Sequence, residues 1–385
     1  MNRCILVLAA LAALAWTANA ENQVVCYYGS WAGYRNSDGR FDISHIDPKL
    51  CTHLIYSFVG INKNGDIRVM DPYNDLPDDY GKNGFGKFVE LRKKSPNAKM
   101  MVAIGGWSEG SDGFSTVVNN PSLRAKFVKN AVAFVKKYHF DGFDVDWEYP
   151  NQRGGKKEDL QNFVNVLKEL KTELKKSNLL LSIAVGAPES LASQSYKPIK
   201  SVCDNVDFVN LMTYDLAGTW EQVTGHHAGL YAHKSGHKLN VDAAVQYWLN
   251  NGCSSKKLIV GVPLYGRAFT LADKNKHGLE APSIGPATAG PYTQEGGYLG
   301  YNEICVLLKQ GGWKVEHHKD QRTPYAYKNN QWIGYDDKTS IKEKVDYIKK
   351  KNLGGAMVWS IDTDDFLGKC GEKFPLLTAL SKGLK

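Results

Sequence analysis

The sequence from Asp141 to Pro150 reads DGFDVDWEYP. Acidic and apolar side chains alternate along it, with acids at Asp144, Asp146 and Glu148 and apolar residues at Phe143, Val145 and Trp147. This period of two predicts a β-strand. Side chains two residues apart on a strand share one face and lie roughly 6.6 Å from each other, so the three acids point the same way.

Three carboxylates on one face form either a solvated edge or a reactive site. A solvated edge, with acids outside and apolar residues inside, is typical of an antiparallel sheet, whereas the surrounding chain indicates a parallel one. Carboxylates this close in a site screened from water cannot all be ionised, so one keeps a proton at neutral pH. General acid catalysis requires such a proton, and we therefore expect Asp144, Asp146 and Glu148 to form a catalytic site.

Short β-rich runs alternate with helical patterns along most of the chain. The β-rich runs cover residues 23–29, 53–61, 99–107, 142–148, 179–187, 207–215, 257–266 and 355–362. The clearest helical patterns cover residues 121–138, 158–175, 241–250 and 339–351, with a last one at 374–384. Eight strands alternating with helices indicate an α/β fold, the (β/α)8 TIM barrel. An open doubly wound sheet is the alternative, but it usually carries a glycine-rich phosphate turn after its first strand, and this sequence has none there.

One interval breaks this alternation. Residues 268–334, between the seventh and eighth expected strands, are rich in Gly, Pro and Tyr and contain strand-like pieces at 325–327 and 331–335. The interval is too long for an ordinary loop of a compact domain. We therefore expect a small α+β insertion within a barrel that spans residues 21–385.

The first twenty residues have the pattern of a secretory signal peptide. Arg3 precedes an apolar run, and Ala18, Asn19 and Ala20 form a small-x-small cleavage site. No later apolar run is long enough to span a membrane, so we expect a soluble, secreted, extracellular protein. The net charge of +8 has no basic block longer than Lys349 to Lys351, which argues against a nucleic-acid partner.

Six cysteines follow the expected cleavage site, and an even number in an exported chain favours disulfides. Their positions relative to the expected strands suggest the pairs Cys26–Cys51, Cys203–Cys253 and Cys305–Cys370. The middle pair joins the starts of two adjacent strands, and the last joins the insertion to the C-terminal region. A zinc site is the competing interpretation, but no Cys-x-x-Cys spacing occurs. The adjacent pair His226 and His227 is interpreted as part of a loop.

Aromatic residues gather where the expected strands end, which is the functional face of such a barrel. They are Tyr27, Trp31, Phe58, Trp107, Trp147, Tyr149, Tyr214, Trp220, Tyr265 and Trp359, accompanied by Gly106, Met212, Asp215 and Arg267. Any one of these aromatic residues alone is better explained as core. Their shared position favours a lined groove, and aromatic rings pack well on the flat C–H faces of sugars. A long aromatic groove with central acids suggests a polysaccharide substrate.

The spacing Asp141-x-x-Asp144-x-Asp146-x-Glu148 resembles the signature of family 18 glycoside hydrolases, the chitinases of the insect and vertebrate type. The resemblance implies that Glu148 protonates the glycosidic oxygen, that Asp146 contacts the acetamido group of the substrate, and that Asp144 takes up charge from Asp146. It implies that Tyr214 hydrogen-bonds the acetamido oxygen and that Trp359 forms the floor beneath the reacting sugar. Met212, Asp215, Tyr265 and Arg267 match positions in the cleft, and the insertion forms one wall of it.

The resemblance implies a retaining endochitinase that cuts chitin and chitooligosaccharides, with the substrate acetamide as nucleophile. It implies no metal and no organic cofactor, and we expect a monomer. One alternative is a chitin-binding lectin or growth-factor-like relative, in which the position of Glu148 is typically replaced. Another is an endoglycosidase that acts on the chitobiose core of N-glycans. The sequence departs from many relatives at Ala217, where a larger polar residue is common, and this affects the expected contacts on the leaving-group side. Ser108 is another variable place, and both positions affect the preferred chain length.

Overall fold

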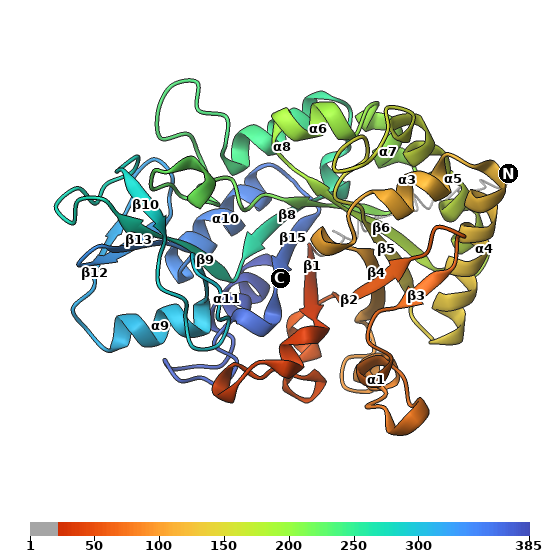
Figure 1. The fold of residues 1–385 in the computed structure, drawn as a ribbon, viewed down its shortest axis with the longest axis horizontal. Helices are drawn as coiled ribbons and strands as arrows, with labels where there is room; N and C mark the ends of the chain where they lie inside the picture. The colour runs from red at the N-terminus through yellow and green to blue at the C-terminus, as the bar shows by residue number, and fades with distance from the viewer. Residues whose placement is uncertain (1–21) are drawn as a thin grey trace, which may run out of the picture.

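The computed structural model describes residues 22–385 of the chain (Figure 1). The expected signal peptide, residues 1–20, lies outside the described residues. Within the described part, no helix is both long and apolar enough to cross a membrane.

The main sheet closes on itself and forms the expected (β/α)8 barrel. Its parallel strands are β1 (Gln23–Gly29), β2 (His53–Ile61), β4 (Lys99–Gly105), β5 (Gly142–Asp146), β6 (Leu180–Gly186), β7 (Phe208–Met212), β8 (Leu258–Pro263) and β15 (Gly355–Trp359). Closure comes from β1, which pairs with β2 on one side and with β15 on the other. The short strand β3 (Ile67–Val69) is antiparallel and extends β2 outside the barrel.

The barrel strands are apolar on both faces because each face is buried. Val25, Ile55 and Met101 point into the barrel, where they form an inner core. Val24 and Leu54, one residue earlier on β1 and β2, point outward and pack beneath the helices. Parallel strands that are covered on both sides have such continuous apolar runs, and these runs allowed the strands to be predicted from the sequence.

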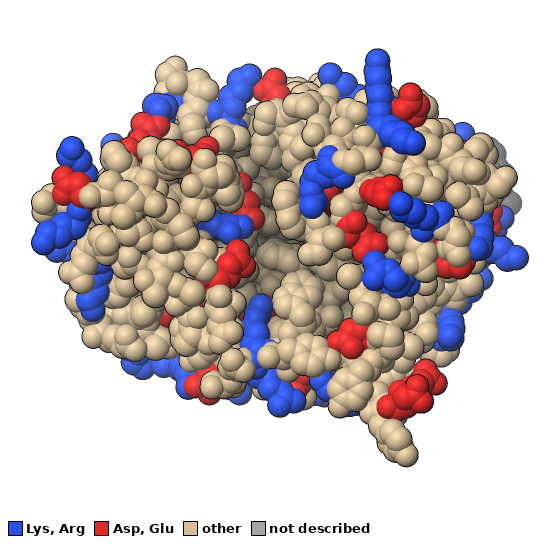
Figure 2. Space-filling view, viewed as in Figure 1, with Lys and Arg blue, Asp and Glu red and all other residues tan. Residues whose placement is uncertain are grey.

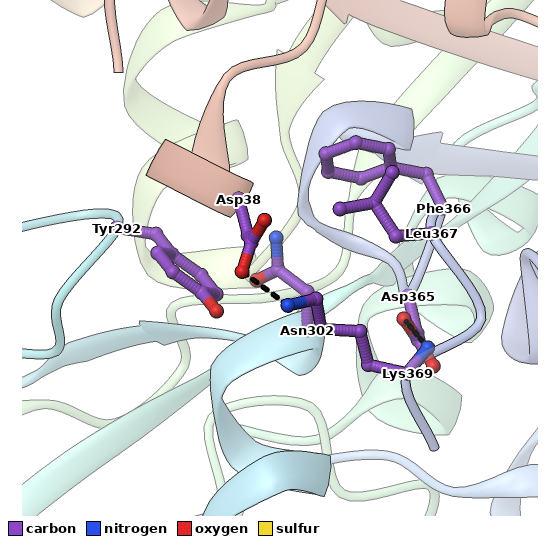
Figure 3. A pocket seen from close by; sticks show the side chains of 7 residues that line it. All are labelled: Asp38, Tyr292, Asn302, Asp365, Phe366, Leu367 and Lys369. Atoms are coloured by element: carbon purple, nitrogen blue, oxygen red, sulfur yellow. Dashed lines mark hydrogen bonds and ion pairs between the residues drawn. The ribbon is translucent and has the colours of Figure 1, made fainter. Parts of the chain in front are cut away.

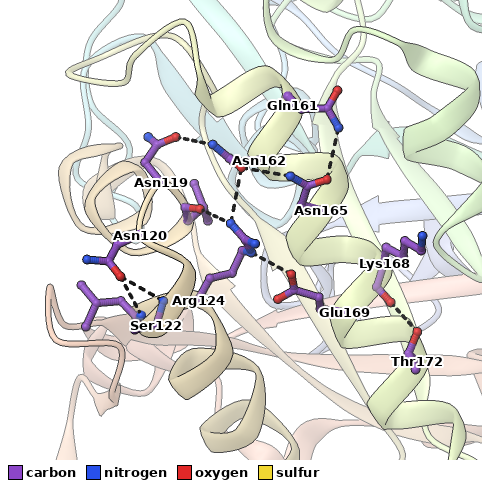
Figure 4. A network of polar contacts seen from close by, with 12 residues as sticks. Asn119, Asn120, Ser122, Arg124, Gln161, Asn162, Asn165, Lys168, Glu169 and Thr172 are labelled. Atoms are coloured by element: carbon purple, nitrogen blue, oxygen red, sulfur yellow. Dashed lines mark hydrogen bonds and ion pairs between the residues drawn. The ribbon is translucent and has the colours of Figure 1, made fainter.

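Helices surround the barrel. They are α1 (Pro72–Asp75), α2 (Gly84–Val89), α3 (Asp112–Val118), α4 (Pro121–Lys137), α5 (Asp159–Lys175), α6 (Glu189–Ser195), α7 (Ile199–Asp204), α8 (Val241–Asn250), α10 (Lys338–Lys350) and α11 (Pro375–Leu384). The side chain of Asn120 caps α4 by accepting hydrogen bonds from the backbone N–H groups of Ser122 and Leu123. Arg124 and Glu169 form an ion pair of 2.9 Å between α4 and α5 within a wider polar network (Figure 4).

A second, antiparallel sheet lies beside the barrel, on the left of Figure 1. Its strands run in the order β10 (Ser283–Pro286), β9 (Tyr265–Leu271), β14 (Gln331–Gly334), β13 (Pro324–Lys328) and β12 (Lys314–His317), and β11 (Tyr298–Gly300) also pairs with β9. Helix α9 (Tyr301–Lys309) packs against this sheet. This arrangement is the expected α+β insertion between the seventh and eighth barrel strands.

The boundary between the two sheets differs from the prediction. The seventh barrel strand ends at Pro263, and Tyr265 already begins β9 of the second sheet. The expectation that the seventh strand continues to Gly266 was therefore wrong, and Tyr265 and Arg267 belong to the second sheet. The sequence signal is ambiguous because two apolar strands follow each other with Leu264 alone between them.

All three expected disulfides form, with Cα–Cα distances of 6.1 Å for Cys26–Cys51, 5.5 Å for Cys203–Cys253 and 6.1 Å for Cys305–Cys370. In residues 22–385, the one cluster of three potential metal ligands is Cys305, Cys370 and Asp365, and its two sulfurs are bonded to each other. The zinc alternative therefore lacks free thiolates. An ion pair between Asp38 and Lys369 lies close to this bridge, in a pocket that has no room for a ligand (Figure 3).

Candidate active site

Strand β5 places the acids as its alternation predicts. Phe143, Val145 and Trp147 point outward into the layer beneath the helices. Asp144 and Asp146 therefore point into the barrel, and Glu148 follows two residues beyond the end of the strand. The three acids are 0%, 3% and 9% exposed, respectively. A cluster of carboxyls buried this deeply requires partners or protons.

Asp144 has its partners within the barrel. Its carboxylate accepts hydrogen bonds from the hydroxyl of Ser182 at 2.5 Å and from the hydroxyl of Tyr27 at 2.7 Å. The side-chain amide of Asn210 lies 3.5 Å away. Burial raises the pKa of Asp144 to about 6, because these hydrogen bonds offset only part of the cost of burying its charge. Asp144 is thus mostly ionised at pH 7.

Asp146 differs from Asp144 because one of its oxygens, Oδ1, is buried and has no hydrogen-bond partner among the described residues. Burial, and then the charges of Glu148 and Asp144, raise the pKa of Asp146 well above its usual range. An unpartnered buried carboxyl is costly in a structure, and such groups are concentrated at functional sites. Asp146 is therefore poised to interact with a ligand.

Glu148 has the proton affinity of a general acid. Burial raises its pKa to about 7, against the lowering effects of a hydrogen bond with Tyr149 and of the charge of Arg153. A large fraction of the molecules therefore carries a proton on Glu148 at neutral pH. Burial also raises the pKa of the Tyr149 hydroxyl, so this neighbour stays neutral.

Aromatic rings form a continuous stack beside the acids. The ring of Phe58 lies 6.0 Å from that of Trp31 and 5.8 Å from that of Trp359, and both pairs are stacked. Trp107 and Trp220 stand out from the surface, each 61% exposed. Figure 2 shows a hollow between the second sheet, on the left, and the β2–β6 side of the barrel, on the right. The hollow and the exposed rings favour the expected aromatic groove, which stays a prediction.

Gly106 allows the close packing at one side of this groove. Its φ is +82°, in the region that favours glycine, and an added Cβ would lie 2.6 Å from the Phe58 ring. Its backbone N–H donates a hydrogen bond of 2.8 Å to the carbonyl oxygen of Asp146. Gly106 therefore brings the end of β4 against the acid strand, and its role is in the backbone geometry.

The second sheet contributes an ion pair that faces the barrel. Arg267 binds both oxygens of Asp215, with distances of 2.8 Å from Nε and 2.6 Å from Nη2. The hydroxyl of Tyr265 donates to the same carboxylate at 2.7 Å. Burial would raise the pKa of Asp215, but its contacts with His227 and Arg267 hold it well below its usual range. Asp215 is therefore a fixed carboxylate, and the barrel and the second sheet are joined through it.

The predicted site residues divide into three groups. Tyr27 and Tyr265 are only 1% and 2% exposed, and their hydroxyls are bonded to Asp144 and Asp215. In this geometry their hydroxyls support carboxylates, and direct contact of either ring with substrate stays a prediction. Tyr214 and Met212 pack with Trp359 at the mouth of the inner core. Of the other predicted residues, Trp31, Trp107 and Trp220 are exposed, Phe58, Tyr149 and Trp359 are half-buried, and Trp147 is buried beneath the helices, outside the groove.

Residues 23–364 match the sequence profile of the Glycosyl hydrolases family 18. The chain belongs to this family. It is 39% identical to the Endochitinase of Manduca sexta over 398 residues. This alignment covers 99% of this chain and 71% of that protein. The crystal structure of the Group IV chitinase of Ostrinia furnacalis in complex with allosamidin has a TM-score of 0.91 and 45% identity, covering 94% of this chain and 99% of that one.

Not every relative in family 18 is described as an enzyme. Human YKL-39, described as a pseudo-chitinase with retained chitooligosaccharide binding properties, has a TM-score of 0.86 and 37% identity, covering 94% of this chain and 99% of that one. Family membership therefore establishes the barrel and the glycoside hydrolase relationship. The distinction between cleavage and binding rests on the acids and their surroundings.

Several residues that shape this family 18 site were not predicted from the sequence. Ser182 comes from β6, which pairs with β5, and Asn210 comes from β7, the strand after it; both bond Asp144. His227, interpreted as a loop residue, is 1% exposed and lies 3.4 Å from Asp215. Tyr298 of β11 stacks on Tyr265, with ring centres 4.4 Å apart. The sequence signal that could have identified Ser182 and Asn210 is a small polar residue at an inward-facing position of a barrel strand. The positions of His227 and Tyr298 depend on the packing of a loop and of the second sheet against the barrel, for which the sequence has no local signal.

Proposed function

We propose that this chain is a secreted endochitinase that hydrolyses β-1,4 linkages between N-acetylglucosamine units of chitin with retention of configuration. One observation carries the proposal: a carboxyl that holds a proton near neutral pH, Glu148, lies beside an unpartnered buried carboxyl, Asp146. The aromatic stack of Trp31, Phe58 and Trp359 gives a surface on which sugar rings pack. The names of the chitinase relatives support chitin as the polymer.

The proposed reaction starts with proton transfer. Glu148 gives its proton to the glycosidic oxygen as the bond from that oxygen to the sugar C1 breaks. The carbonyl oxygen of the substrate acetamide attacks C1 and forms an oxazolinium ion. Asp146 stabilises the positive charge of the ion, with Asp144 able to accept a proton from Asp146. Tyr214, whose pKa is raised by burial and then by the charges of Asp146 and Glu148, stays protonated and can donate to the acetamide oxygen.

The second half of the reaction restores the enzyme. Glu148, now ionised, takes a proton from water as the water oxygen attacks C1 and the bond from the acetamide oxygen to C1 breaks. Two inversions at C1 leave the product in the β configuration. The low pKa of Asp215 and its bonds to Arg267 and Tyr265 favour a positioning role for this carboxylate over attack on C1.

The test is turnover of purified chitin oligomers by the purified protein, with the anomer of the fresh product followed by NMR. Fresh β-anomer supports the proposal, and fresh α-anomer contradicts it. Binding without any turnover supports the lectin alternative, for which human YKL-39, a pseudo-chitinase that binds chitooligosaccharides, is an example in the family. Cleavage confined to N-glycan cores supports the endoglycosidase alternative.

We also propose that the protein is exported to the extracellular space. The three disulfides of the described residues support this, because such bonds persist in oxidising compartments. Recovery of processed protein, beginning at Glu21, from the medium of expressing cells would test it.

A further inference from the structure

Glu148 lies beyond the hydrogen-bonded part of β5. The strand pairs with β4 as far as Asp146 and with β6 as far as Val145. Residues 147–149, which we call the acid segment, therefore lie outside the paired register of the barrel sheet. A reacting group has to be held within about 0.5 Å of its productive position by the contacts of its surroundings. The proposed general acid thus needs a support other than the sheet itself.

The hydroxyl of Ser111 contacts the acid segment on both sides of Glu148. It accepts a hydrogen bond of 2.9 Å from the indole Nε1–H of Trp147 and donates one of 3.0 Å to the backbone carbonyl oxygen of Tyr149. Ser111 and Trp147 are each 1% exposed, so bulk water does not compete for the bond between them. One side chain therefore joins the residue before the acid to the residue after it.

Ser111 occupies a position where a serine ordinarily has another task. It is the N-cap residue of α3, and serine is favoured at such positions because its hydroxyl accepts a hydrogen bond from a backbone N–H of the first turn. The hydroxyl of Ser111 makes no capping bond. Both of its hydrogen bonds go to the acid segment instead. This arrangement indicates that the acid segment, and not the end of α3, is what the hydroxyl stabilises.

The surroundings of Ser111 hold it in place. Glu109, two residues earlier, accepts a hydrogen bond of 2.7 Å from Arg68 of β3. In the first turn of α3, the ring of Phe114 stacks on that of Trp147, with ring centres 5.2 Å apart and planes inclined by 13°. The loop before α3 and the helix itself are therefore both fixed, and the hydroxyl acts on the acid segment from a rigid support.

We propose that Ser111 is a positioning residue for Glu148: by holding the acid segment, its hydroxyl aims the Glu148 carboxyl at the glycosidic oxygen. The proposal rests on the proposed function, which assigns the proton transfer to Glu148. Because Ser111 is buried, it acts through the acid segment and not on the substrate. Its loss should therefore lower the rate of the proton transfer more than it weakens the binding of sugars.

Loss of the hydroxyl should also change the acidity of Glu148, whose pKa is raised to about 7 by burial. Without Ser111 the buried indole N–H of Trp147 loses its partner, and the acid segment moves toward water to satisfy it. A better solvated carboxyl has a lower pKa, so the alkaline limb of kcat/KM moves to lower pH. The substitution leaves unchanged the titratable and charged groups around Glu148, which are Asp146, Tyr149, Arg153, Tyr196, Tyr214 and Asp215.

The experiment compares S111A with S115A in the full chain. Ser115 is the matched control, because it lies one turn further along α3, is 2% exposed, and donates its hydroxyl to Asp159 at 2.8 Å, outside the acid segment. S111T keeps a hydroxyl at position 111. The kcat, the KM and the pH dependence of kcat/KM are measured on a soluble chitin oligomer. Thermal unfolding curves verify that each variant folds.

A titration that needs no turnover accompanies the kinetics. The carboxyl carbons of the glutamates are labelled with carbon-13 and followed by NMR as the pH is changed, and the spectrum of E148Q identifies the Glu148 signal. In S111A this signal should titrate at lower pH than in the wild type. In S115A and S111T it should titrate as in the wild type.

For S111A we expect kcat to fall about ten- to a hundredfold, since a misplacement of about 1 Å at a reacting group costs about a hundredfold, while KM stays near wild type. S115A and S111T should keep kcat near wild type. An equal loss of kcat in S111A and S115A overturns the proposal, and so does an S111T as slow as S111A or an S111A that matches the wild type. If the wild-type protein cuts no chitin oligomer, the proposed activity fails, while the titration of Glu148 still decides whether Ser111 holds the acid segment.

Discussion

The guanidinium of Arg153 lies flat against Trp107, with its central carbon 3.6 Å from the centre of the ring. The same guanidinium donates hydrogen bonds to the carbonyl oxygens of Trp107, at 2.7 Å, and of Glu148, at 2.9 Å. One side chain therefore joins an exposed aromatic residue of the groove to the segment that carries the proposed general acid. Its positive charge also lowers the pKa of Glu148 against the raising effect of burial.

Removing the charge of Arg153 should shift the pH profile. Glu148 is proposed to act in its protonated form, so activity falls as the pH rises through its pKa of about 7. In R153M the pKa of Glu148 rises further, and the alkaline limb of kcat/KM should move to higher pH. R153K is the matched control, because it keeps the charge while losing the flat contact with Trp107. An alkaline limb that moves equally in both variants would show that the charge of Arg153 does not set it.

Loss of the flat contact should weaken binding of long oligomers. An exposed contact between a cation and an aromatic ring contributes about 0.5–1 kcal/mol, so R153K should raise the KM for long oligomers about two- to fivefold. The kcat at saturation should change little. A KM that stays at the wild-type value in R153K would mean that Trp107 holds its position without Arg153.

Replacing Glu148 by Gln should remove turnover and keep binding. The amide has the shape of the carboxyl but no proton to transfer, and general acid catalysis contributes about a hundredfold to ten-thousandfold in rate. We therefore expect kcat of E148Q to fall by at least about a hundredfold, with affinity for chitin oligomers, measured by calorimetry, near wild type. A rate near wild type would assign the proton transfer to another residue.

The exposed tryptophans of the groove should determine adsorption to insoluble chitin. Trp31 and Trp107 are 43% and 61% exposed, so Ala at both positions removes large ring faces without opening a core cavity. Adsorption of W31A/W107A should fall by about tenfold or more, at about 1 kcal/mol or more for each stacked ring. W31F/W107F, which keeps smaller rings, should lose less. Equal adsorption of the Ala variant and the wild type would contradict a groove lined by these rings.

Hydrolysis should require the N-acetyl group of the cleaved sugar. Fully deacetylated chitosan keeps the backbone and hydroxyls but lacks the oxygen that attacks C1, so it should bind weakly and stay uncut. A stable thiazoline analogue of the oxazolinium ion should inhibit competitively. Product analysis by mass spectrometry checks the first expectation. If a covalent glycosyl ester on Asp215 were trapped, Asp215 would be the nucleophile and the substrate-assisted mechanism would be contradicted. The assignment as a glycosidase would be unchanged.

Much of the fold could be predicted because barrel strands that are buried on both faces have continuous apolar runs in the sequence. The eight barrel strands are the eight expected runs, with ends that differ by a few residues, and the clearest helices are correct to within about one residue at each end. The end of β8 was misplaced because Leu264 alone separates two apolar strands, and the hydrogen-bond partners that distinguish them lie elsewhere in the chain.

The sequence by itself determined that Asp144, Asp146 and Glu148 share a face, since the alternation of a strand is a local property. Only the tertiary structure decided their chemical states. Ser182 and Tyr27 reach Asp144 from other strands, while Asp146 is left without a partner on one oxygen. A pKa depends on burial and on charges a few ångströms away, and closure of the barrel brings those groups together from distant positions in the chain. The pairing of Arg153 with Trp107 depends on tertiary structure for the same reason, because forty-six residues separate the two in the sequence.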